Sequence, residues 1–140
     1  MKAIMVRRHG GPEVLEIVEL PDPVPAADEV LVEVARAGMN FADTHQRHND
    51  YLAKAELPLI PGVEISGRTG DGRRVAAILT SGGYAERVAV PESSLVRVPD
   101  EVSDDQAAAI LLQGLTAWAL LRVSARLRAG ETVVIEAAAG

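Results

Sequence analysis

The chain has 140 residues, enough for a domain with its own core, and 48% of them are hydrophobic, which excludes a disordered chain. Its 14 basic and 20 acidic residues give a net charge of −6, which argues against nucleic acid or an anionic membrane as a partner. There is no cysteine, which excludes disulfides, thiolate nucleophiles and cysteine-based zinc sites. The N-terminus lacks a signal-like apolar stretch, and no apolar run approaches the roughly 20 residues that span a bilayer. We therefore expect a cytoplasmic protein.

Short strands dominate the first two thirds of the chain. Apolar and polar residues alternate most clearly over residues 29–37, the pattern of a half-buried strand. An Asp-Gly pair inside Gly70-Asp71-Gly72 predicts a hairpin between its flanking runs. The run Pro21-Asp-Pro-Val-Pro25 is an extended connector. The predicted strands are residues 3–7, 14–20, 29–37, 63–69, 73–79, 84–90 and 95–98.

Helices and one buried strand follow. Ser103 and Gln106 have the spacing of a capping box, which predicts the start of a long helix. Residues 107–112 are apolar on all sides, so we expect this helix to be buried. Gly114 is expected to mark a break or a close contact, before a second helix at 116–127. A shorter helix is predicted over residues 40–47.

The order of elements predicts a mainly β protein with some α. A largely antiparallel β domain comes first, and an α/β domain begins after a boundary near residues 112–125. Residues 132–135 form a β-branched run, followed by small residues that end in Gly140. Such a pattern is typical of a parallel strand entering a glycine-rich phosphate turn. The turn needs further glycines and a helix, which this chain does not contain.

Several motifs in a fixed order resemble those of zinc-independent quinone oxidoreductases (zeta-crystallin-like) of the medium-chain dehydrogenase/reductase superfamily. The resemblance covers nearly the whole chain, as an N-terminal part of such a protein. Each motif alone is weak, whereas seven in family order are specific. They are HGGPEVL (9–15), EVLVEV (29–34), AGMNFAD (37–43), PGVE (61–64), GGYAE (82–86), LQGLTA (112–117) and GETVV (130–134).

The resemblance implies a GroES-like β-barrel catalytic domain over residues 1–118. It also implies that residues 119–140 are the linking helix and first strand of a truncated Rossmann NAD(P)-binding domain. The expected activity is NADPH-dependent hydride delivery to a quinone or similar small electron-poor acceptor. We expect a homodimer when the protein is full length, and an isolated 140-residue chain without activity. No membrane or nucleic-acid partner is expected.

The same resemblance implies chemistry without a metal. Asn40 occupies the position of a cysteine zinc ligand in zinc-dependent relatives, and Val63 that of a histidine ligand. A quinone is already electrophilic, so the protein has only to orient it and stabilise developing oxyanion charge. We predict Asn40 and Tyr51 as catalytic hydrogen-bond donors. From residue chemistry alone, Asn40 could instead serve a left-handed turn after Gly38.

Residues Asn40, Asp43, Thr116 and Gly140 are the predicted cofactor contacts, with NADPH bound mainly by the part that this chain lacks. Asp43 could equally cap the short helix, and Thr116 could cap the predicted second helix. Glu64 could be a group of the cleft or a buried partner for an arginine such as Arg87, and the structural role is the one that we favour.

A metal site is not predicted, although four possible ligands lie close together in the sequence: Asp43, His45, His48 and Asp50. The resemblance gives no support for such a site.

Two other functions remain open from the sequence. An enoyl reductase of the same superfamily, of the polyketide or fatty-acid type, would use the same fold and NADPH. A non-enzymatic GroES-like fragment or interaction module belongs to a different class.

Overall fold

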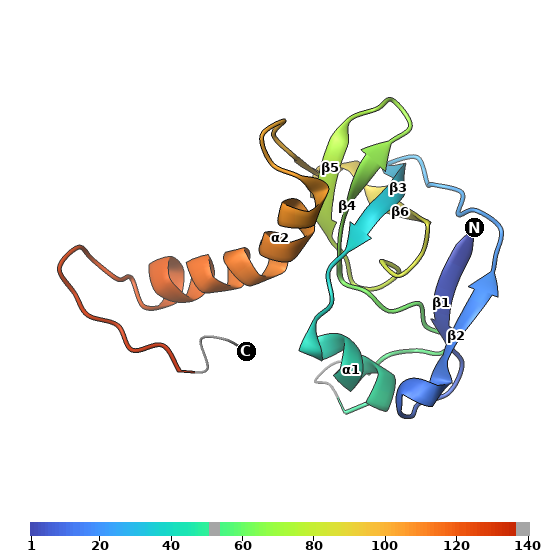
Figure 1. Ribbon diagram of the computed structural model, residues 1–140, viewed down its shortest axis with the longest axis horizontal. Helices are drawn as coiled ribbons and strands as arrows, with labels where there is room; N and C mark the ends of the chain where they lie inside the picture. The colour runs from blue at the N-terminus through green and yellow to red at the C-terminus, as the bar shows by residue number, and fades with distance from the viewer. Residues whose placement is uncertain (51–53, 137–140) are drawn as a thin grey trace.

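Two antiparallel sheets and a projecting helix make up the computed structural model, which describes residues 1–50 and 54–136 (Figure 1). The smaller sheet pairs β1 (Lys2–Val6) with β2 (Leu15–Glu19). The larger has the order β6-β3-β4-β5-β7 and antiparallel pairing throughout. Its strands are β3 (Glu29–Ala37), β4 (Glu64–Thr69), β5 (Arg74–Ile78), β6 (Arg87–Pro91) and β7 (Val96–Arg97).

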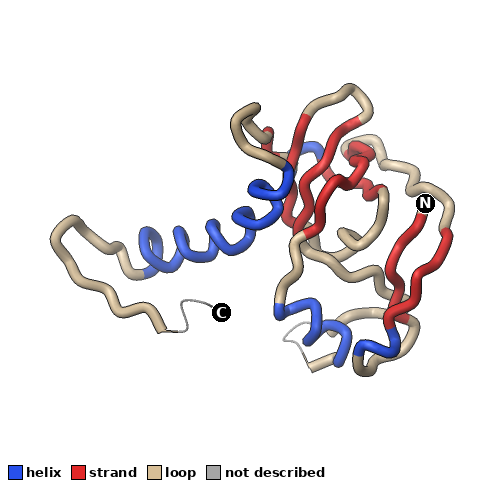
Figure 2. The backbone as a smooth tube through the Cα atoms, in the orientation of Figure 1, coloured by secondary structure: helices blue, strands red, loops and turns tan. Residues whose placement is uncertain are grey.

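The β-rich architecture predicted from the sequence is confirmed. Strand β3 has the predicted bounds, and β4 and β5 form the predicted hairpin, with Gly72 at a φ of 87° that favours glycine. Isolated bridges join Ala3 to Ala85 and Val6 to Leu59, so β1 is tied to the rest of the fold. Figure 2 shows the strand pair β1–β2 set apart from the larger sheet.

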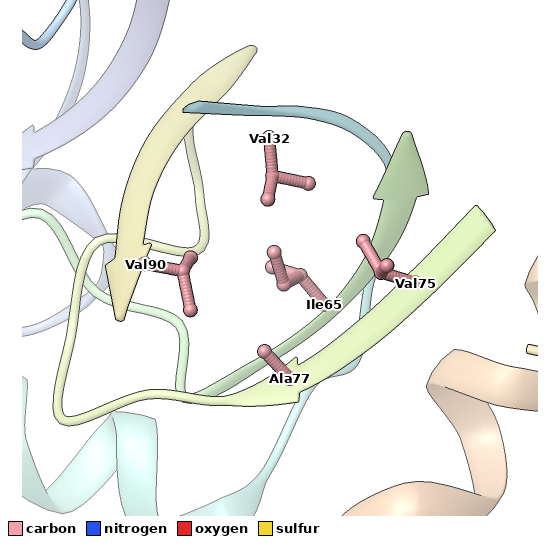
Figure 3. Packing of buried hydrophobic residues seen from close by; sticks show 5 residues of the cluster. All are labelled: Val32, Ile65, Val75, Ala77 and Val90. Atoms are coloured by element: carbon pink, nitrogen blue, oxygen red, sulfur yellow. The ribbon is translucent and has the colours of Figure 1, made fainter. Parts of the chain in front are cut away.

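The main core lies inside the curved larger sheet (Figure 3). Its members come from four different strands and point toward one another, because alternate residues of each strand face the same side. These are Val32, Ile65, Val75, Ala77 and Val90, each at most 2% exposed. Aliphatic side chains therefore carry the packing in this core.

Helix α2 (Asp104–Trp118) begins as predicted but is not buried as predicted. Ser103 Oγ accepts a 3.1 Å hydrogen bond from the Gln106 backbone N–H, and Gln106 Oε1 accepts one of 2.9 Å from the Ser103 N–H. Arg74 on β5 holds Asp104 in a 2.8 Å ion pair. Beyond the buried pair Ala107 and Ala108, the helix leaves the sheet, as Figure 1 shows.

The expected break at Gly114 is wrong, since α2 runs through it and continues into η3 (Ala119–Ser124). Ile110 is 65% exposed and Trp118 59%. All-round apolarity predicted burial, but the described residues cover only part of the helix surface, as at Leu111. The run from Asp104 to Ser124 is long and apolar enough to cross a membrane, with mean hydropathy 1.4 and 11% of the window buried. Length and composition are the sole grounds for that possibility.

The strand predicted at residues 132–135 is not formed in the described part of the chain. Val133 and Ile135 instead line an open cavity of about 400 Å³ beside Leu120 and Leu121. A parallel strand needs a neighbour to complete its backbone hydrogen bonds, and the described residues supply none. The domain boundary at residue 118 stays a prediction.

Candidate functional site

Asn40 immediately precedes helix α1 (Phe41–His48) and receives side chains from two other elements. Its backbone is extended, with φ −124° and ψ 148°, so the left-handed-turn interpretation of this residue is wrong. The side-chain Nδ2 donates a 2.8 Å hydrogen bond to Glu64 Oε1, and Oδ1 accepts one of 2.5 Å from Gln113 Nε2. The amide is therefore held on both sides.

Glu64 is the buried residue of this group, at 2% exposed. Its second oxygen, Oε2, accepts a 2.8 Å hydrogen bond from the backbone N–H of Leu112. Gly38 makes room for the carboxylate, because a Cβ at Gly38 would overlap it. The prediction that Glu64 pairs with Arg87 is wrong, since Arg87 instead contacts Asp22 at 2.7 Å.

Asp43 lies in the first turn of α1 and is 7% exposed. Its Oδ2 accepts hydrogen bonds from the Asn40 backbone N–H at 2.8 Å and from the Tyr84 hydroxyl at 2.7 Å. Burial, and next the hydrogen bond to Asp43, raises the pKa of the Tyr84 phenol above its ordinary value of 10.0. The structure thus gives Asp43 the helix-capping role, and its contact with a cofactor stays a prediction.

The histidines of α1 do not form a metal cluster. His45 Nδ1 lies 2.8 Å from Asp50 Oδ1, and this hydrogen bond is the main cause that lowers the pKa of Asp50 below 3.8. Asp43 is engaged with Tyr84 instead. No group of three or more potential ligands occurs in residues 1–50 and 54–136.

Two predicted site residues, Tyr51 and Gly140, lie outside the described residues. Thr116 is exposed inside α2, one turn beyond Gln113, so it does not cap a second helix. The structure brings Asn40 and Asp43 together. It also adds three residues to which sequence reasoning gave no such role: Glu64, Tyr84 and Gln113.

A cavity of about 520 Å³ lies on another side of α1. Gln46, Lys54 and Thr80 contribute polar groups, and Met5 and Leu59 contribute apolar ones. Asn40 and Glu64 are not among its lining residues, so this cavity is separate from the Asn40 group.

The sequence matches the alcohol dehydrogenase GroES-like domain family over residues 26–73. The quinone oxidoreductase of Pseudomonas aeruginosa is 40% identical over 150 residues, covering 99% of this chain and 46% of that protein. Human quinone oxidoreductase is 35% identical over 152 residues, and the match covers 100% of this chain and 46% of the human protein. The chain thus spans somewhat less than half the length of these relatives.

Solved structures give the same result. Quinone oxidoreductase from Thermus thermophilus, studied alone and with NADPH, has a TM-score of 0.88 and 44% identity over 94% of this chain and 43% of that one. The Escherichia coli quinone oxidoreductase complexed with NADPH has a TM-score of 0.83 and 34% identity, and the match covers 89% of this chain and 41% of that one. The chain is therefore similar, over nearly its whole length, to the N-terminal part of quinone oxidoreductases, and residues 26–73 of it match a GroES-like domain.

Proposed function

We propose that this chain is the acceptor-binding part of an NADPH-dependent oxidoreductase that delivers hydride to a quinone or similar electron-poor acceptor without zinc. The observation that carries the proposal is the fixed amide of Asn40, held between Glu64 and Gln113. The sequence resemblance implies that zinc-dependent relatives have a metal ligand at this position. Similarity to quinone oxidoreductases solved with NADPH supports the same activity.

The residues of the site suit a neutral acceptor. Asn40 Nδ2 carries two hydrogens, one of which is used by Glu64. The other can donate to a quinone oxygen as negative charge develops on it, which lowers the barrier most when the donor is already oriented. NADPH, when bound, supplies the hydride. The role of this chain is to orient the acceptor and stabilise its oxygen.

Cofactor binding is proposed to need residues beyond those described. The predicted phosphate turn includes Gly140, which lies outside the described part. The amide of Gln113, which contacts Asn40, and the exposed hydroxyl of Thr116, one turn further along α2, fit the uncharged nicotinamide end of a cofactor rather than its phosphates. The exposed apolar side chains of α2 fit the packing surface of a nucleotide-binding domain.

Two measurements test the proposal. Calorimetric titration of NADPH into the 140-residue chain is expected to show no binding in the micromolar range. A chimera, in which this chain replaces the aligned N-terminal part of the Thermus thermophilus enzyme, is expected to oxidise NADPH with 1,4-benzoquinone. Turnover of a crotonyl thioester but not of benzoquinone would favour the enoyl-reductase alternative and overturn our choice.

A non-enzymatic interaction module is the second candidate, favoured by the same exposed face of α2. An inactive but correctly folded chimera would support it. A cytoplasmic location and a homodimer of the full-length protein also remain proposals.

A further inference from the structure

Three elements meet at the Asn40 amide, and each supplies one polar group. Asn40 stands at the start of α1, Glu64 opens β4, and Gln113 lies in α2. Asn40 and Glu64 are 24 residues apart in the chain, and Asn40 and Gln113 are 73 apart. Only the folded chain can therefore assemble this group.

The partners specify which way the amide faces. A carboxylate accepts hydrogen bonds and cannot donate them, so Glu64 must face the NH₂ end of Asn40. Turning the amide over would place Asn40 Oδ1 against Glu64 Oε1 and leave that oxygen of the buried carboxylate without its donor, which is costly. Gln113 Nε2 occupies the opposite end by donating to Oδ1. One Asn40 N–H remains, in a direction that these two contacts define.

Docking of α2 does not account for this arrangement. The start of the helix is held independently by the Arg74–Asp104 ion pair and by a 2.7 Å hydrogen bond from Ser66 Oγ to the Asp104 carbonyl. Glu64 contacts the Leu112 backbone two turns later, and its other oxygen is directed to Asn40. The Leu112 contact engages only one oxygen of Glu64, so docking of the helix does not by itself explain the bond from Asn40 to the other oxygen.

We propose, resting on the function proposed above, that Glu64 and Gln113 are positioning residues that orient Asn40 so that one N–H points at the acceptor oxygen. They act through Asn40 and do not touch the acceptor themselves.

A charge swap separates positioning from stability. Glu64→Gln keeps the shape but presents an NH₂ group to one of its two donors, so one hydrogen bond is lost. The double variant Asn40→Asp with Glu64→Gln reverses the polarity, because the new amide at position 64 can donate to the new carboxylate and still accept from the Leu112 N–H. Each single or double change alters few atoms, and the double variant keeps the original net charge.

In the chimera described above, E64Q is expected to lower kcat by about tenfold to a hundredfold, since a misplacement of about 1 Å can cost about 10²-fold, with the KM for NADPH unchanged. The swap is expected to recover the thermal stability lost in E64Q, whereas kcat stays as low or falls further, because the amide donor is gone. Asp104→Asn, the control on the same helix, should lower stability alone. The proposal is overturned if the double variant Asn40→Asp with Glu64→Gln recovers kcat together with stability. It is also overturned if kcat is unchanged in E64Q.

The 140-residue chain gives a readout that needs no activity. In ¹H–¹⁵N spectra the Asn40 NH₂ group should show two well-separated protons, one shifted downfield by the bond to Glu64. E64Q and Gln113→Met should each move these signals, and D104N should leave them in place. Unmoved signals in E64Q overturn the proposed positioning. Failure of the proposed function is distinct, because it appears as a parent chimera without quinone-dependent NADPH oxidation.

Discussion

The phenol of Tyr84 donates a 2.7 Å hydrogen bond to Oδ2 of Asp43, the same oxygen that accepts the backbone N–H of Asn40. One buried carboxylate oxygen thus connects the chain before β6 with the first turn of α1. The position of Asn40 at the start of that helix depends on this contact.

Replacing Tyr84 by Phe should make the free energy of unfolding depend less on pH in the alkaline range. The folded-state pKa of Tyr84 is raised above 10.0. The phenol therefore stabilises the folded state fully below about pH 10, and this stabilisation is lost as the pH rises further. At pH 8 we expect Y84F to be less stable by about 1–3 kcal/mol, because Asp43 loses a donor. The difference should shrink above about pH 10.

Thermal unfolding of the parent chain and of Y84F from pH 8 to pH 11 measures the stability difference between them. Tyr51 is present in both, so its ionisation cancels in the comparison. A stability difference that stays constant over the whole range would contradict the assignment.

Gly38→Ala should destabilise the fold, because the added Cβ would overlap the buried carboxylate of Glu64. Overpacking of this kind costs about 1–3 kcal/mol. Gly70→Ala is the matched control, since a Cβ there would meet nothing within 4 Å. Urea denaturation of the two variants compares their free energies of unfolding, and equal values would argue against tight packing around Glu64.

Removing Arg74 should affect stability far more than removing Arg7. Arg74 is mostly buried, pairs with Asp104 at 2.8 Å and also donates to the Val102 carbonyl at 2.6 Å. Arg74→Met should cost about 1–3 kcal/mol because these acceptors lose their donor. Arg7 forms an exposed pair with Glu16 at 3.4 Å, so Arg7→Met should cost about 1 kcal/mol or less. Chemical denaturation measures both, and similar costs would contradict the ranking.

The exposed apolar side of α2 should make the 140-residue chain self-associate, since contiguous exposed apolar surface favours association. Sedimentation velocity should show a sedimentation coefficient that rises with concentration. The double change Leu115→Lys with Trp118→Lys should abolish that rise. Val24→Lys is the control, because Val24 is 90% exposed but lies in the loop before β3. A monomer at all concentrations would count against the prediction.

Local patterns predicted most of the secondary structure. The bounds of β3 and the Ser103–Gln106 capping box depend on residues a few positions apart, so periodicity and residue type were sufficient. Family motifs also predicted Asn40 and Asp43 as site residues; the structure places the two in hydrogen-bond contact, and their role in a site stays a prediction. The hydrogen-bond partners of Glu64 were not predictable from pattern, since Asn40 and Leu112 lie 24 and 48 residues away.

The predictions for the last third of the chain differ from the structure for a similar reason. An apolar run indicates that a helix needs a partner, but not whether the chain itself supplies one. Residues 107–112 therefore predicted a buried helix, and Ile110 proved 65% exposed. The β-branched run at 132–135 likewise has strand propensity but no neighbour among the described residues with which to pair.

By itself, the sequence determined the β-rich fold, the capped start of α2 and the identity of the amide at residue 40, because each is set by neighbouring residues or by residue type. The tertiary structure decided the direction of that amide. Only folding places the acceptor-only Glu64 at one end of Asn40 and the donor of Gln113 at the other, and these contacts leave one N–H for the chemistry.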